Sequence, residues 1–247
     1  MTAPVDIIKT NLDNLTSLWK TVGIPFNGFV ATPTYNYCKI PGSDWPNRLW
    51  FKQDVTPELL APALATLPGG KMTIPYWDIY GTNADEYIMA QGGVKSSEQA
   101  GMSLKLERPF TSAQHLRYER VSTPEQADAW AAIYPQSFGY QISAEILKRT
   151  CQVIRFYLVY SGDQPIGTAI LHCADGVAGI HGVGVIPEMR KKGFANEIME
   201  YVLNESIGLN ASYATLQASK MGIGIYLKMG FEEQFLIRNY AFITAQQ

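Results

Sequence analysis

The sequence has few cysteines, and their number and spacing exclude two kinds of site. Cys38, Cys151 and Cys173 are odd in number and far apart along the chain. They therefore provide neither a disulfide framework nor a Cys-x-x-Cys metal or redox site. We expect buried thiols and a protein of a reducing compartment, the cytoplasm.

A surplus of charge of one sign is lacking as well. The 247 residues include 20 Lys and Arg against 22 Asp and Glu. The part before Pro109 has 9 basic against 10 acidic residues, and the part after it has 11 against 12. Because no basic half or tail exists, we expect neither nucleic acid nor a membrane surface as a partner.

Long hydrophobic runs are absent too. The first ten residues, MTAPVDIIKT, lack the basic region and apolar stretch of a signal peptide. Residues 21–38 carry no charge, but they include two prolines and two glycines and so predict loop and strand. With 47% hydrophobic and 17% charged residues, the composition is that of a globular protein.

Apolar spacing and turn residues predict an α/β protein in two parts, a smaller α/β domain over residues 1–109 and a second domain over 110–247. In the first part we expect a helix over the first 20 residues, strands over 36–40, 48–52, 71–77 and 102–106, and helices over 56–67 and 84–90. In the second part we expect strands over 115–121, 153–160, 165–173, 177–186, 211–217 and 231–243, and helices over 124–136, 143–152, 192–205 and 221–228. This order predicts a mixed sheet with helices on its faces.

The stretch from residue 179 to 200, GIHGVGVIPEMRKKGFANEIME, carries the strongest chemical signal. A strand rich in glycine and valine passes through Pro187 and a basic turn directly into a helix. Free amides at a helix N-terminus attract anions, and Gly193 and Ala195 let a phosphate approach the backbone. The three cations at 190–192 favour a pyrophosphate. The alternative is a solvated basic first turn, although cations there oppose the helix dipole. Neither a Walker loop nor a dinucleotide fingerprint is present.

Two motifs together resemble the GCN5-related N-acetyltransferase (GNAT) family, here a bacterial two-domain type. The first is Arg190-x-x-Gly193-x-Ala195 after a strand that ends Val-Ile-Pro. The second is Tyr226, separated by three residues from the pair Gly230-Phe231 at the end of a short helix. The resemblance covers residues 110–243 and implies the GNAT acyl-CoA N-acyltransferase fold for the second domain.

The resemblance implies acetyl-CoA as co-substrate, without a metal. Val183 and Val185 would pair their backbone groups with the pantetheine arm, which behaves like an added strand. The pyrophosphate would bind the turn, mainly through backbone amides, and Ser219 would touch the cofactor. Tyr226 would lie beside the thioester sulfur and protonate the leaving thiolate. The implied cofactor-binding set is therefore Val183, Val185, Arg190, Lys191, Lys192, Gly193, Phe194, Ala195, Ser219 and Tyr226.

His181 is a candidate base. Its side chain shares the parity of Val183 and Val185 along the strand, a face on which some family members carry their base. Two alternatives stay open: water takes the proton, or His181 simply packs against the sheet. The reaction would be direct attack of an amine on the acyl carbonyl, with the developing oxyanion held by a backbone N–H.

The predicted function is an acetyl-CoA-dependent N-acetyltransferase that acts on a small-molecule primary amine, as a monomer or homodimer. The acyl donor is acetyl-CoA or a longer acyl-CoA. The rival is a non-catalytic CoA or acyl-CoA binding module with an interaction or sensor role. Trp130, Tyr134, Phe138 and Tyr140 lie where family members differ most, which predicts an acceptor with an apolar or aromatic part.

The element order of the first domain echoes that of the second, so we consider a degenerate GNAT-like copy. Tyr87 stands where Tyr226 stands in the other half. The acidic stretch 54–58 occupies the position of the basic turn, so this copy should not bind CoA. Its aromatics either line an acceptor cleft between the domains or form core: Trp45, Trp50, Tyr76 and Trp77.

Overall fold

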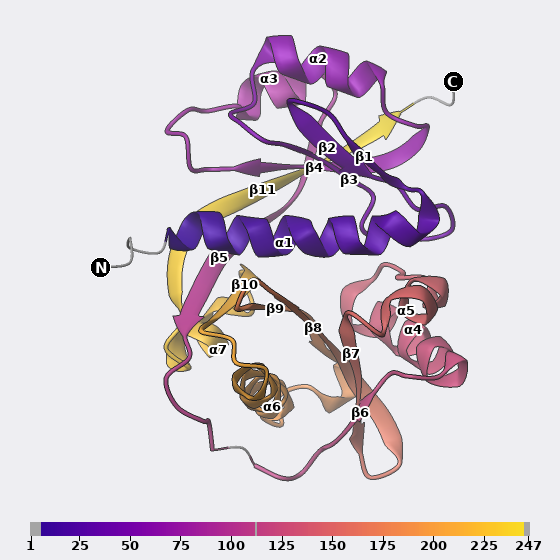
Figure 1. Ribbon diagram of the computed structural model, residues 1–247, viewed down its shortest axis with the longest axis vertical. Coiled ribbons are helices and arrows are strands. Elements are labelled where there is room, and N and C mark those ends of the chain that lie inside the picture. The colour runs from indigo at the N-terminus through magenta and orange to yellow at the C-terminus, as the bar shows by residue number, and fades with distance from the viewer. Residues whose placement is uncertain (1–5, 112, 245–247) are drawn as a thin grey trace.

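The computed structural model describes residues 6–111 and 113–244, and these form one mixed sheet covered by helices (Figure 1). The strand order in the described part is β1-β2-β3-β4-β11-β5-β10-β9-β8-β7-β6. The predicted mixed α/β fold is confirmed. Val5, which the sequence placed at the start of the first helix, lies outside the described residues.

The elements follow the predicted order closely. The first half contains α1 (Ile7–Gly23), a 3-10 turn (Ile24–Phe26), β1 (Phe29–Ala31), β2 (Tyr35–Cys38), β3 (Arg48–Phe51), α2 (Pro57–Ala65), β4 (Gly70–Trp77), α3 (Asp85–Ala90) and β5 (Val94–Lys105). The second half contains β6 (Arg117–Arg120), α4 (Pro124–Phe138), α5 (Ala144–Thr150), β7 (Arg155–Ser161), β8 (Gln164–Ala174), β9 (Val177–Val185), a 3-10 turn (Pro187–Met189), α6 (Phe194–Gly208), β10 (Tyr213–Ser219), α7 (Ile223–Lys228) and β11 (Glu232–Thr244).

The two halves exchange their last strands. β11, the end of the second half, pairs with β4 on one side and with β5 on the other. β5, the end of the first half, pairs with β10 as well as with β11. The sheet therefore continues from one half into the other, and the domain boundary predicted at Pro109 falls in the connection between β5 and β6.

Both halves have the order β-β-β-α-β-α-β at their ends, which agrees with the hypothesis of a degenerate copy. In the second half, β8 and β9 are antiparallel and β9 and β10 are parallel. In the first half, β2 and β3 are antiparallel and β3 and β4 are parallel. The last strand of each copy then lies against the partner half, a topology that the linear order alone does not reveal.

Opposite faces of β8 and β9 carry different helices. A β-carbon on Gly184 would contact Phe138 of α4, whereas one on Gly167 would reach Ile198 of α6. Helix α1 lies on the same face as α4 and spans the middle of the molecule between the two halves (Figure 1). It buries Leu15, Leu18 and Val22 against the sheet. α1 thus closes one face of the sheet where the halves meet.

Candidate functional site

The parallel strands β9 and β10 separate soon after they pair. Residues 213–215 of β10 lie against residues 177–179 of β9, and no further pair between them follows in the described strands. β10 continues to pair with β5 up to Ser219. The facing edges of β9 and β10 therefore diverge beyond Gly179 and leave an opening in which backbone groups face one another. This is the shape that strand-like recognition of an extended ligand needs.

A β-bulge in β9 lies beside this opening. The register with β8 shifts between Thr168 and Ile170, and Gly182 has φ of +56°, a conformation that glycine adopts without strain. The Thr168 hydroxyl donates to the Gly182 carbonyl at 2.9 Å. The bulge inserts one residue and so reverses the side-chain parity beyond it.

The parity predicted for His181 is consequently wrong. His181 pairs with Ile170, and Gly184 with Thr168, so these two β9 residues share the face of α1 and α4. Val185 pairs with Gly167 and shares the face of α6. A uniform strand would have kept His181 and Val185 together, but the extra residue at the bulge separates them.

The basic turn at residues 190–195 presents its amides to solvent. Lys191 has φ of +63° and Gly193 has φ of +82°, so the backbone reverses its curvature twice before α6 begins. Among the described residues, none of the five amides from 191 to 195 has a hydrogen-bond acceptor, whereas Asn196 and Glu197 both donate to the Gly193 carbonyl. A β-carbon on Gly193 would meet nothing within 4 Å. Such a concave row of free amides at a helix N-terminus suits a phosphate.

The Arg190 side chain has a different role from the amides around it. Its Nε–H donates to the Val185 carbonyl at 3.0 Å, and Nη2 donates to the Ser137 carbonyl at 3.3 Å. The guanidinium therefore ties the turn to the end of β9 and to α4. Lys191 and Lys192 are exposed and remain the cations that can reach a ligand, while Phe194 and Ala195 are half-buried in the first helical turn.

Glu197 anchors the chain next to this turn. Its buried carboxylate accepts hydrogen bonds from the His115 and Leu116 amides, each at 2.9 Å, and Nδ1 of His115 lies 3.2 Å from its second oxygen. A hollow of about 290 Å³ beside it is lined partly by Lys192 and Gly193. The sequence showed no signal for Glu197, because its partners lie about 80 residues away.

Tyr226 and Ser219 lie on the β10 side of the opening. Tyr226 is half-buried in α7, its ring packs edge-on against Phe231 at 5.9 Å, and burial raises the pKa of its phenol to about 12. The phenol is therefore protonated at neutral pH. Ser219 ends β10, and the chain turns over residues 219–222 before α7 begins. Gly222 precedes α7, and a β-carbon there would lie 3.0 Å from the Tyr226 ring.

His181 lies beneath α1, and one nitrogen of its imidazole has no hydrogen-bond partner among the described residues. Burial is the main cause that lowers the pKa of His181 to about 3, and the charge of Arg48 acts in the same direction. Its Nε2 is buried with no hydrogen-bond partner among the described residues. A β-carbon on Gly179 would lie 2.7 Å from this nitrogen. The imidazole is thus neutral at physiological pH and a weak base.

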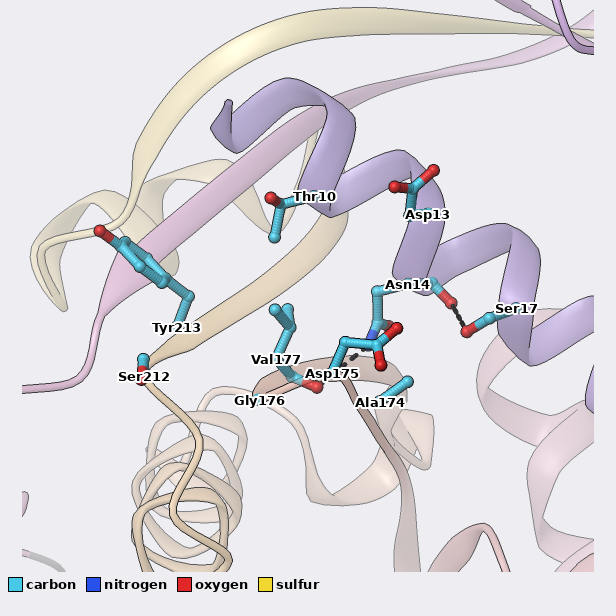
Figure 2. A pocket seen from close by; sticks show the side chains of 10 residues that line it. All are labelled: Thr10, Asp13, Asn14, Ser17, Ala174, Asp175, Gly176, Val177, Ser212 and Tyr213. Atoms are coloured by element: carbon cyan, nitrogen blue, oxygen red, sulfur yellow. Dashed lines mark hydrogen bonds between the residues drawn. The ribbon is translucent and has the colours of Figure 1, made fainter. Parts of the chain in front are cut away.

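A cavity of about 290 Å³ lies elsewhere, at the end where β9 and β10 remain paired (Figure 2). Asn14 of α1 projects into it and donates to the carbonyls of Val177, at 3.1 Å, and His172, at 3.2 Å. None of the site residues predicted from the sequence lines it. Asn11 and Asn14 of α1 are buried, and two asparagines within an amphipathic helix are a signal that could have revealed this polar contact, although it was not used.

The comparisons with known proteins agree with this geometry. Residues 152–233 match the family model of the acetyltransferase (GNAT) domain. A GCN5-related N-acetyltransferase from Kribbella flavida has 16% identity and a TM-score of 0.65, with 92% of this chain and 94% of that chain covered. One from Sphaerobacter thermophilus has 14% identity and a TM-score of 0.59, with 92% and 86% covered. A functionally unknown conserved protein from Staphylococcus epidermidis has 15% identity and a TM-score of 0.62, with 92% and 97% covered. No curated protein matches the chain.

Residues 152–233 are thus similar to the GNAT acetyltransferase domain, and the chain shares its fold with GCN5-related N-acetyltransferases over nine tenths of its length. The resemblance seen in the two sequence motifs is confirmed. The likeness in fold extends through both halves, since the solved structures cover the first half as well as the second. In the described ranges, 6–111 and 113–244, no helix has both the length and the apolarity to cross a membrane.

Proposed function

We propose that this chain transfers an acetyl group from acetyl-CoA to the primary amine of a small molecule by direct attack. The observation that carries the proposal is that three features follow one another from β9 to α6. These are the β-bulge at Gly182, the divergence of β9 from β10, and the turn at residues 190–195 with its free amides. Beyond Gly179, the backbone groups of β9 have no pair on β10 in the described strands. The five amides of residues 191–195 have no hydrogen-bond acceptor among the described residues. An extended pantetheine arm suits the unpaired strand edge, and a pyrophosphate suits the free amides of the turn.

Acetyl-CoA, when bound, supplies an acyl carbonyl activated as a thioester. A backbone N–H of β9 beside the bulge would hold the acyl oxygen, on which negative charge would develop. Tyr226 stands on the opposite side with a protonated phenol, and it donates this proton to the departing thiolate. Lys191 and Lys192 attract the pyrophosphate through the exposed turn.

Water, and not His181, takes the proton from the amine in this proposal. A base works best when its pKa lies near the working pH, and the pKa of His181 is lowered to about 3. Its Nε2 is buried with no hydrogen-bond partner among the described residues, so no neighbouring group there would relay a proton from it. The rival function, a CoA-binding module without catalysis, shares the turn and differs by needing no role for Tyr226.

Calorimetry with acetyl-CoA tests the proposal. Gly193→Glu adds charge and bulk where the turn is open, and it should abolish detectable binding. Gly208→Glu, an identical change at the exposed far end of α6, is the matched control and should bind as the wild type does. S-acetylpantetheine, which lacks the pyrophosphate, should bind both variants equally. A folded wild type that does not bind acetyl-CoA would contradict the proposal. Binding without turnover of any amine would favour the non-catalytic module.

A further inference from the structure

Arg48 is a cation without an anion. It lies on β3 in the first half, and its guanidinium carbon stands 5.1 Å from the ring centre of Trp19 in α1. Nη1 donates to the Pro46 carbonyl at 3.1 Å, while Nε is buried and has no partner in the part of the chain that the structure describes. Within the described ranges Arg48 forms no ion pair with a carboxylate. The other partly buried arginines do: Arg155 lies 2.9 Å from Glu205, and Arg238 lies 2.9 Å from Asp78.

The groups whose charge would act on Arg48 are a thiol and two phenols, with no carboxylate among the described residues. Cys38 of β2 is the residue that pairs with Arg48, and burial raises the pKa of its thiol to about 12. Tyr134 and Tyr140 share a hydrogen bond between their hydroxyls, and burial raises the pKa of Tyr134 well above its ordinary value. His181 is close enough for the charge of Arg48 to act on it. Nothing in this set balances the guanidinium.

Arg48 is partly buried, and its Nε is fully buried. Withdrawing a cation from water without a counter-charge is costly. The ring of Trp19 offsets a part of the cost through a cation–π contact. The planar fork of N–H donors remains, and its geometry matches a carboxylate. A guanidinium without a counter-charge lowers the stability of the protein, and a ligand that carries an anion would remove this cost.

The position of Arg48 relates it to the transfer site. Arg48 belongs to β3 in the first half, but its side chain lies on the face of the sheet that α1 and α4 cover. His181 of β9 lies on the same face. His181 is next to the point at which β9 leaves β10. A ligand anchored at Arg48 therefore approaches the opening from the face of the sheet that α1 and α4 cover. The turn at residues 190–195 approaches it from elsewhere.

We infer that Arg48 binds a carboxylate of the acceptor, so that the substrate is an amino acid or another amine that carries a carboxylate. This inference rests on the proposed N-acetyl transfer. Arg48 holds the carboxylate, the hydroxyl pair of Tyr134 and Tyr140 offers one further donor, and the amine points toward the opening between β9 and β10. The first half is then part of the acceptor site, which gives a reason for its fusion to the second.

Matched pairs of acceptors test the inference. L-Phenylalanine against phenethylamine, and L-leucine against isopentylamine, differ only by the carboxylate. For the wild type we expect kcat/KM to be higher for the carboxylate member. Arg48→Met should lower it by about 10- to 100-fold, mainly through KM, and leave the decarboxylated amine within about threefold. Arg48→Lys keeps the charge and should retain part of the preference.

Two controls separate the possible failures. Arg120→Met removes an arginine that also donates to a backbone carbonyl, that of Cys151, and it should change neither member of a pair. Calorimetry with acetyl-CoA and with L-phenylalanine is run on every variant. If no amine is acetylated but L-phenylalanine binds the wild type and not Arg48→Met, the anion site stands and the proposed transfer fails. If each pair reacts and binds alike in wild type and Arg48→Met, or if Arg48→Met merely lowers stability, Arg48 is structural and the inference is overturned.

Discussion

Gly179 of β9 and Asn14 of α1 are in such close contact that a β-carbon on Gly179 would lie 1.9 Å from Oδ1 of Asn14. The amide nitrogen of the same asparagine donates to the carbonyls of Val177 and His172. Helix α1 therefore approaches the sheet at the residue where β9 and β10 last pair. The absence of a side chain at Gly179 permits this approach, and the approach sets the position of α1 between the two halves.

Gly179→Ala should lower the free energy of unfolding by about 1–3 kcal/mol, because either α1 or Asn14 has to move to admit a methyl group. Gly208→Ala is the control: a β-carbon there meets nothing within 4 Å, and the residue ends a helix. It should be neutral or slightly stabilising, by up to about 1 kcal/mol. Urea denaturation measures both. Equal effects of the two substitutions would argue against the contact.

Local signals allowed most elements to be predicted. The start of α4 is an example, because a hydroxyl cap at Thr123 is followed by Pro124 and the carboxylate of Glu125. In the structure Thr123 and Gln126 form a capping box, with the Thr123 hydroxyl accepting from the Gln126 amide at 3.3 Å. Such signals lie within a few residues and need no knowledge of the fold. The polar run 94–99 gave no strand signal, yet it forms part of β5 because β11 pairs along it and β10 reaches its end.

Features that depend on pairing between distant segments could not be predicted. The bulge at Gly182 is defined by the pairing of β9 with β8, which the sequence of β9 does not show. The sequence therefore predicted that the side chains of His181 and Val185 lie on the same face. The uncompensated charge of Arg48 appears only when α1 and the second half are in place. The motif at Arg190 was visible, but not that its side chain bonds to backbone carbonyls of Val185 and Ser137.

Arg190→Met should weaken acetyl-CoA binding by about 10-fold through loss of the two hydrogen bonds that hold the turn. Because the guanidinium is bound to protein carbonyls, the salt dependence of binding should remain as in the wild type. Lys192→Met, which removes an exposed cation, should instead reduce the salt dependence. Calorimetry at two ionic strengths distinguishes them. A smaller salt dependence in Arg190→Met would show that Arg190 contacts the phosphates directly.

Acid should destabilise the protein through its buried histidines. Burial lowers the pKa of His172 to about 4 and is the main cause that lowers that of His181 to about 3. The unfolded chain therefore binds protons first as the pH falls below about 6.5, and the free energy of unfolding decreases by up to about 1.4 kcal/mol per pH unit for each histidine. The stabilisation is complete above this pH.

His172→Gln provides the measurement for this effect. Its imidazole Nε2 lies 2.8 Å from the Ser17 hydroxyl, a contact that an amide can replace. The plot of unfolding free energy against pH, from pH 7 to 5, should be shallower in the variant, whatever its absolute stability. Parallel plots for wild type and variant would mean that His172 does not titrate differently on folding.

Tyr226→Phe should reduce kcat by about 100-fold and leave acetyl-CoA binding unchanged, because only the proton donor to the thiolate is lost. The substitution retains the ring that packs against Phe231 and beside Gly222, so the fold of α7 is preserved. Since burial raises the pKa of this phenol to about 12, the wild-type rate should show no loss from Tyr226 ionisation up to pH 10. Tyr213→Phe, at the paired end of β10, is the matched control and should keep the wild-type rate. A kcat for Tyr226→Phe within twofold of the wild type, with acetyl-CoA bound normally, would remove Tyr226 from the reaction and leave water as the acid.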